Sequence, residues 1–141
     1  MPKFFSCWLP LIAYCLLIFV QSSLPVSEDL PTWPLSDKLL HLGGYALLGI
    51  LFYRALSTLS WAAQGRRQIW AAIIATGLYG ISDELHQGFV ASRTADSLDA
   101  LMDILGGALG VMILHAGQAW LARRTPKVAA LTSPPGSDNK M

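Results

Sequence analysis

Two segments of the sequence hold most of the side chains that could do chemistry. The first places an acid, an amine, an imidazole and a phenol close together, at Asp37, Lys38, His41 and Tyr45. The second contains acids, an amide and a guanidinium, at Asp83, Glu84, Gln87, Arg93, Asp99 and Asp103. Imidazole and carboxyl groups are the usual general acids and bases, and arginine suits phosphate. These residue types therefore indicate proton transfer, phosphate binding or cation binding.

The spacing of these residues is helical. Asp37, His41 and Tyr45 recur every four residues, so they share one face of a helix. The pairs formed by Asp83 with Gln87 and by Asp99 with Asp103 have the same spacing. Three helices are thus expected to present polar stripes that could meet one another.

Composition places these helices in a membrane. The chain has 141 residues, of which 53% are hydrophobic and 13% charged, against roughly 25% charged in soluble domains. The formal net charge of +1 gives no field that would attract nucleic acid, so no nucleic-acid partner is expected. Cys7 and Cys15 would lie about 12 Å apart along a helix, beyond disulfide reach. The sequence indicates one small domain in a bilayer.

Four apolar runs predict an all-α fold, a compact bundle of four transmembrane helices over residues 1–124. The runs are Phe4–Val20, Leu39–Leu56, Ile69–Ile81 and Leu98–Ala122. The third run reaches the required length of about 20 residues only if Ser82–Gly88 continues the helix. Glycines 106 and 110 form a small-xxx-small pattern, which predicts close helix packing. The polar tail over residues 125–141 is predicted to be disordered.

Basic residues predict the orientation. Eight Lys and Arg residues fall on one side of the four spans, and only Lys38 and Arg93 on the other. Because basic residues near span ends stay in the cytoplasm, both termini are expected there, in a multi-pass protein of the cytoplasmic (inner) membrane. A cleaved signal peptide ending near Ser22 and Ser23 is the alternative. Pro10 and the lack of an A-x-A site count against it.

The polar residues then gather at the outer end of the bundle. Six acids face Lys38 and Arg93, a local charge of −4 with histidine neutral. A charge within the membrane costs about 2.5–3.5 kcal/mol unless it is paired or hydrated. Paired charges could serve only to fix helix register, as a polar lock, whereas surplus acids favour a cavity open to water, cations or a ligand.

These motifs resemble the VanZ-like family of small membrane proteins. The stretch SDKLLHLGGYALLG supplies Asp37, Lys38, His41 and Tyr45, and SDELHQG supplies Asp83, Glu84 and Gln87. Arg93, Asp99 and Gly106 continue the pattern, so that the core motif region covers residues 37–110. Asp103 stands where the family pattern has Asn. The family is named for a member associated with resistance to the glycopeptide teicoplanin, and the resemblance implies a bacterial cell-envelope protein without implying resistance.

Binding of a lipid or lipid-linked head group is the first functional hypothesis. Arg93 and Lys38 would hold phosphate, and Asp99, Asp103 and Gln87 would contact sugar hydroxyls. The expected partners are membrane lipids or a lipid-linked envelope precursor. The remaining residues predicted to contribute to the binding site are Asp37, His41, Tyr45, Asp83 and Glu84.

An intramembrane acid–base enzyme is the second hypothesis, with His41 paired to Asp37 or Glu84 as the catalytic candidates. No cofactor or dedicated metal site is predicted, although the oxygen-rich cluster leaves a divalent cation open. A proton- or cation-coupled transporter is a third hypothesis, which the apolar cytoplasmic half disfavours. A structural role with a protein partner or a second copy of the chain is the fourth.

Overall fold

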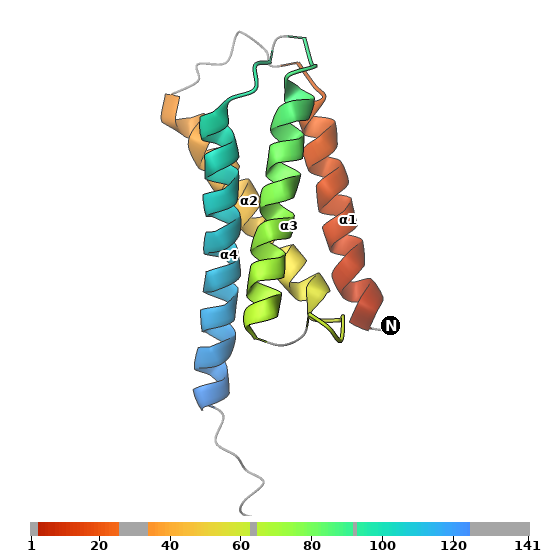
Figure 1. The fold of residues 1–141 in the computed structure, drawn as a ribbon, viewed down its shortest axis with the longest axis vertical. Helices are drawn as coiled ribbons and strands as arrows, with labels where there is room; N and C mark the ends of the chain where they lie inside the picture. Colours follow the sequence, from red (N-terminus) through yellow and green to blue (C-terminus); the bar gives the residue numbers. More distant parts are fainter. Residues whose placement is uncertain (1–2, 26–33, 63–64, 92, 125–141) are drawn as a thin grey trace, which may run out of the picture.

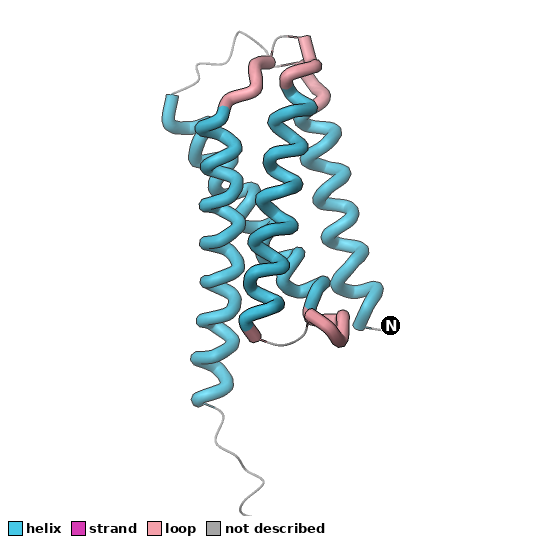
Figure 2. The backbone as a smooth tube through the Cα atoms, viewed as in Figure 1, coloured by secondary structure: helices cyan, strands magenta, loops and turns pink. Residues whose placement is uncertain are grey.

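The computed structural model describes residues 3–25, 34–62, 65–91 and 93–124. Within them lie four helices: α1 (Lys3–Ser22), α2 (Pro34–Leu56), α3 (Arg66–Gln87) and α4 (Ser97–Arg124). The described residues contain no strand (Figure 2). The all-α prediction is thereby confirmed. The predicted disordered tail over residues 125–141 lies outside the described residues.

The helices alternate in direction along one bundle (Figure 1). The N-terminal end of α1 and the C-terminal end of α4 lie at the same end, which also holds the connection from α2 to α3. The start of α2, the end of α3 and the start of α4 meet at the opposite end, called the site end below. In Figure 1, α2 runs obliquely behind α3 and α4.

Three of the described helices are long and apolar enough to cross a membrane: α1, residues Asp37–Leu56 of α2, and α4. The third predicted span does continue through SDELHQ as helix α3, but it falls short of the same apolar composition. Three of the polar residues in this stretch face inward, since Asp83, Glu84 and Gln87 are all buried. At 22 residues α3 is about 33 Å long.

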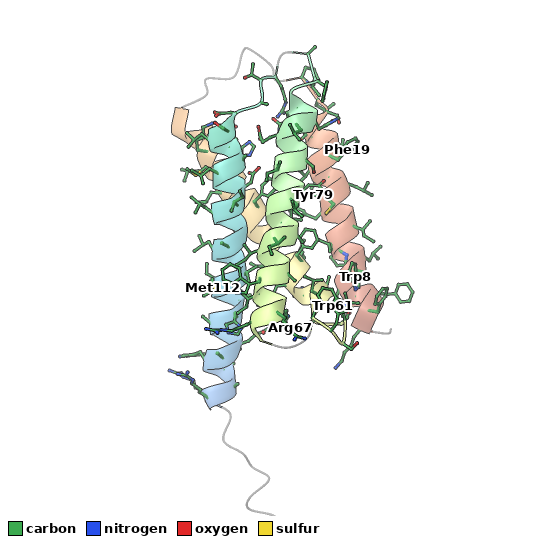
Figure 3. All side chains as sticks on the ribbon, viewed as in Figure 1. Trp8, Phe19, Trp61, Arg67, Tyr79 and Met112 are labelled. Atoms are coloured by element: carbon green, nitrogen blue, oxygen red, sulfur yellow. The ribbon has the colours of Figure 1, made fainter. Side chains whose placement is uncertain are left out.

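Large apolar side chains cover the outside of the bundle. On α1, Phe5, Leu9 and Leu16 are more than half exposed, and Figure 3 shows side chains along α1 pointing away from its neighbours. Many of the residues buried in α3 and α4 are instead small or polar: Ala72, Thr76, Gly77, Gly80, Gly106, Gly107 and Gly110. An apolar exterior around a small and polar interior is the arrangement that lipid favours.

Glycines set the closest contact in the fold, between α2 and α4. A Cβ atom placed on Gly106 would lie 2.3 Å from the carbonyl oxygen of Leu42, and one on Gly110 would lie 2.0 Å from that of Ala46. Side chains at these positions cannot fit without separating the helices. The packing role predicted for the small-xxx-small pattern is confirmed, and it brings the polar face of α2 against α4.

Candidate functional site

Lys38 joins the first turn of α2 to the start of α4. Its Nζ atom lies 2.6 Å from Asp96 Oδ2 and 2.5 Å from Asp99 Oδ1. Asp96 also caps α4, because its Oδ1 accepts a hydrogen bond from the backbone N–H of Leu98. The hydrogen bond from Lys38, together with this backbone bond, holds the pKa of Asp96 below its usual value of 3.8. One amine thus partners two carboxylates.

His41 lies one turn further along α2 and reaches a second acid of α4. Its Nδ1 is 2.9 Å from Asp103 Oδ1 and 3.9 Å from Glu84 Oε1. Asp103 is fully buried. At 2.9 Å, one of the two atoms must carry a proton, so the pair is either a neutral histidine beside a carboxylate or its charged equivalent.

Tyr45 begins a chain of hydrogen bonds that runs along α3 to the following loop. Its hydroxyl donates to Asp83 Oδ2 at 3.1 Å, and Gln87 Nε2 donates to the same oxygen at 3.1 Å. The amide oxygen of Gln87 accepts from Arg93 Nη1 at 3.0 Å. The guanidinium group of Arg93 also donates to the backbone carbonyls of Gln21 and Leu24. Arg93 therefore ties the end of α1 to the end of α3.

Glu84 faces the opposite way from its neighbour Asp83 in this network. Its Oε2 accepts a hydrogen bond from the backbone N–H of Asp96 at 3.0 Å. Its Oε1 and the Oδ2 atom of Asp103 are buried and have no hydrogen-bond partner among the described residues. These two atoms are the unsatisfied polar groups of the site.

A cavity of about 150 Å³ opens between α1, α2 and α3. Six of the residues predicted for the site line it: Asp37, His41, Tyr45, Asp83, Gln87 and Arg93. The other four, Lys38, Glu84, Asp99 and Asp103, do not line it. Instead they join α2 and α3 to α4. The predicted constellation is thus divided into a cavity group and a buried group, with His41 in contact with both.

The division changes the distribution of charge. Asp37, Asp83 and Arg93 give the cavity group a formal charge of −1 with His41 neutral, whereas Lys38, Glu84, Asp99 and Asp103 give the buried group −2. Lys38 already has two carboxylate partners and does not line the cavity. Of the two bases expected to hold phosphate, Arg93 alone among the described residues faces the cavity.

Helix α1 contributes residues to the cavity that the motif analysis does not include. Tyr14, Ile18, Gln21 and Ser22 line one wall, and Ser22 is buried although it lies near a helix end. The polar run Gln21–Ser23 at the end of an apolar span is the sequence signal that marks this wall. His86 contacts the same end of α1, with its Nε2 2.9 Å from the hydroxyl of Ser23.

Two groups of side chains have the residue types and closeness needed to hold a metal ion. One consists of Asp37, His41 and Asp99, and the other of His41, Glu84 and Asp103; in each, one ligand atom per residue lies within 4.8 Å of the others. The second group contains both unsatisfied carboxylate oxygens.

Comparison with known proteins agrees with the motif resemblance. The family model described as VanZ/LLP1 matches residues 7–121. A relative from Schizosaccharomyces pombe, the uncharacterized protein C11E3.10, is 27% identical over 104 residues, which are 73% of this chain and 60% of the relative. The chain thus spans less than two thirds of that relative's length. No solved structure matches the chain.

Proposed function

Because this chain belongs to the VanZ/LLP1 family and carries helices fit to span a bilayer, we propose that it is a four-span membrane protein that binds a phosphate-bearing lipid head group. The head group would occupy the cavity between α1, α2 and α3. Its neighbours would be Arg93, His41 and the two cavity aspartates, Asp37 and Asp83.

The orientation proposed is the one that the basic residues favour, with both termini in the cytoplasm and the site end of the bundle outside, in the cytoplasmic membrane. Helix α3 would also cross the membrane, which brings the number of spans to four. Its buried polar residues would be shielded by α1, α2 and α4. Single cysteines tested with a membrane-impermeant reagent check this in a background with Cys7 and Cys15 replaced. Ser97→Cys should react from outside and Ser60→Cys should not; the reverse pattern would place the cavity in the cytoplasm.

The guanidinium group of Arg93 is the observation that carries the binding proposal. Its hydrogen bonds go to an amide oxygen and to two backbone carbonyls, and no described carboxylate lies within ion-pair distance of it. A planar guanidinium with N–H groups to spare suits a phosphate oxygen better than an amine does. The cavity therefore has a cation that is held in place by neutral groups.

Asp37 and Asp83 indicate what else the head group carries. Both line the cavity, and Asp83 is fixed by Tyr45 and Gln87. Carboxylates repel phosphate but accept hydrogen bonds from hydroxyl or ammonium groups. A head group that combines phosphate with such donors would match both the positive charge of Arg93 and the negative charges of the two aspartates. The relative in a fungus favours a head group found in bacterial and fungal membranes over a precursor restricted to bacterial walls.

Native mass spectrometry of the protein extracted gently from its own membrane tests this proposal. Wild type should carry a discrete adduct with the mass of a phospholipid or lipid-linked phosphate. Arg93→Ala should lose the adduct, and Arg93→Lys should weaken it, because the amine keeps the charge but not the planar group. Arg124→Ala, at the opposite end of the bundle, is the matched control and should keep it.

Melting temperature separates binding from folding in the same samples. The proposal requires that the adduct is weakened in Arg93→Lys while the melting temperature stays near that of wild type. A bare wild-type protein, or an adduct that survives Arg93→Ala, would contradict it. Bare protein would favour the polar lock and direct attention to a protein partner or a second copy of the chain.

Acid–base catalysis on the bound lipid is the second candidate, and the position of His41 favours it. The ring lines the cavity while its Nδ1 is occupied by the fully buried Asp103, which leaves Nε2 to act on a ligand. A buried carboxylate behind a histidine orients the ring and raises its basicity. If the protein is an enzyme, His41→Gln should abolish turnover of native lipid extract but keep the adduct; unchanged turnover would exclude His41.

A further inference from the structure

Two acids of the buried group, Glu84 and Asp103, form with His41 a cluster that has the features of a metal site at the junction of α2, α3 and α4. His41, Glu84 and Asp103 each come from a different helix and place one ligand atom within 4.8 Å of the others. The glycine contacts between α2 and α4, together with Gly80 of α3, hold these helices at fixed separation. A Cβ placed on Gly80 would lie 2.7 Å from the Cβ of Asp103. The three ligand groups are therefore held in place by close contacts between the helices.

Burial of the carboxylates of Glu84 and Asp103 costs free energy unless a partner compensates their charge. Asp103 has no exposed surface, and the side chain of Glu84 is only 7% exposed. One oxygen of each, Asp103 Oδ2 and Glu84 Oε1, has no hydrogen-bond partner among the described residues. An ionised carboxylate buried without full compensation costs several kcal/mol, so buried acids are paired, protonated or bound to metal.

A proton alone compensates this group poorly. Only one proton is needed between His41 and Asp103, and it leaves Glu84 Oε1 and Asp103 Oδ2 without a donor. Lys38 cannot supply the charge, because it is bonded to Asp96 and Asp99. A divalent cation would balance two carboxylates beside a neutral imidazole.

We propose that His41, Glu84 and Asp103 bind a divalent first-row metal ion, Mn²⁺ or Zn²⁺. One imidazole nitrogen with two carboxylate oxygens is a mixed donor set: carboxylates suit Mn²⁺ and imidazole suits Zn²⁺. Mg²⁺ keeps most of its waters and is rarely held by histidine, so it fits less well. In the metal-bound protein, the positive charge of the ion would replace that of the proton shared by His41 and Asp103.

The group formed by Asp37, His41 and Asp99 is the weaker of the two. Asp37 is exposed, and Asp99 is already bonded to Lys38. Neither contributes an unsatisfied buried oxygen. Since His41 belongs to both groups, the unsatisfied oxygens of Glu84 and Asp103 decide between them.

Metal binding shares His41 with the head-group proposal but can be tested separately from it, because Glu84 and Asp103 do not line the cavity. It is tested with the metal alone. Full-length protein in detergent is stripped with a chelator and titrated with Mn²⁺, with the free ion followed by EPR. A second sample is equilibrated with Zn²⁺ and dialysed, and its metal content is measured by atomic emission. Wild type should bind one equivalent of at least one of these ions.

Glu84→Gln and Asp103→Asn should each weaken binding by more than about 100-fold, because even outer-shell partners contribute about 10–100-fold. Asp83→Asn is the matched control: it removes an equally buried carboxylate whose Oδ2 already has two donors, and it should bind as wild type does. Metal should also raise the melting temperature of wild type and leave that of Glu84→Gln unchanged.

Glu84→Gln keeps the test meaningful if Asp103→Asn does not fold, because its melting temperature without metal can be compared with that of metal-free wild type. The proposal is overturned if wild type binds neither Mn²⁺ nor Zn²⁺. So would an equal loss of affinity in Asp83→Asn, which would mean that only the general negative charge attracts the ion. An infrared band of a protonated carboxyl group that disappears in Asp103→Asn, with no metal bound by wild type, would identify a shared proton instead.

Discussion

Alanine at position 106 should separate α2 from α4 at the level of the site. A Cβ at this position would lie 2.3 Å from the carbonyl oxygen of Leu42, about 1.1 Å short of the 3.4 Å at which ordinary contact begins. The opposing atom belongs to the backbone, so no side-chain rotation can relieve the clash. Leu42 follows His41 in α2, and Gly106 lies one turn after Asp103 in α4.

The expected loss combines three effects. Overpacking costs typically about 1–3 kcal/mol. A displacement of about 1.1 Å would lengthen the 2.9 Å contact between His41 and Asp103 to about 4 Å, beyond hydrogen-bond range, at about 1.5–3 kcal/mol for a charged pair. The higher helix propensity of alanine returns about 1 kcal/mol. The net destabilisation of Gly106→Ala should be about 1.5–5 kcal/mol.

Equilibrium unfolding in mixed micelles of rising SDS fraction measures this, with tryptophan fluorescence as the probe. Gly117→Ala is the matched control in the same helix, because a Cβ there meets nothing within 4 Å. It should be neutral or stabilise by up to about 1 kcal/mol. The argument fails if Gly106→Ala is as stable as Gly117→Ala, since the two helices could then separate without penalty.

Three further variants address the polar contacts. Lys38→Met should destabilise the protein by about 1.5–3 kcal/mol, because it leaves Asp99 unpaired. Adding Asp99→Asn should recover part of this loss in a double-mutant cycle. Strict additivity of the two substitutions would show that the residues are not coupled. Tyr79→Phe removes the 2.6 Å hydrogen bond to the carbonyl of Cys15 and should speed maleimide labelling of that cysteine, in a variant whose other cysteine is serine; an unchanged rate would mean that α1 is held without it. The pKa of Asp96 is below its unfolded value of 3.8, so its stabilising contribution is present above that pH and disappears as the pH falls through the lowered pKa. Asp96→Asn should therefore lose less stability on acidification than wild type, and an identical pH profile would contradict this.

Apolar composition predicts the number of helices well but their ends less well. The first and fourth predicted runs agree with α1 and α4 to within two residues at each end. Helix α2 begins at Pro34, five residues before its predicted start, because its first turns are polar. Hydropathy alone assigns these residues to a loop. In the structure Asp37 and Lys38 are helical, and Lys38 bonds to the start of α4.

Spacing predicts which side chains share a face, but not which partners they meet. The four-residue repeat correctly places His41 and Tyr45 on the buried side of α2. The partner of each depends on how α3 and α4 are rotated about their own axes. That rotation is set by contacts such as Gly106 with Leu42 and Gly80 with Asp103, which a single sequence does not reveal. The contribution of α1 to the cavity is missed for the same reason.

The contacts of the site also bear on whether its charges are only a lock. A register lock needs charges that neutralise one another, and Lys38 with Asp99 meets that description. Gly106 and Gly110 already fix the separation of α2 and α4 without any charge. Against that background, Glu84 and Asp103 add buried negative charge and leave two oxygens unsatisfied. Groups that add this penalty where packing is already specified are better explained by the proposed ligands than by stability, and they favour a binding site over a lock.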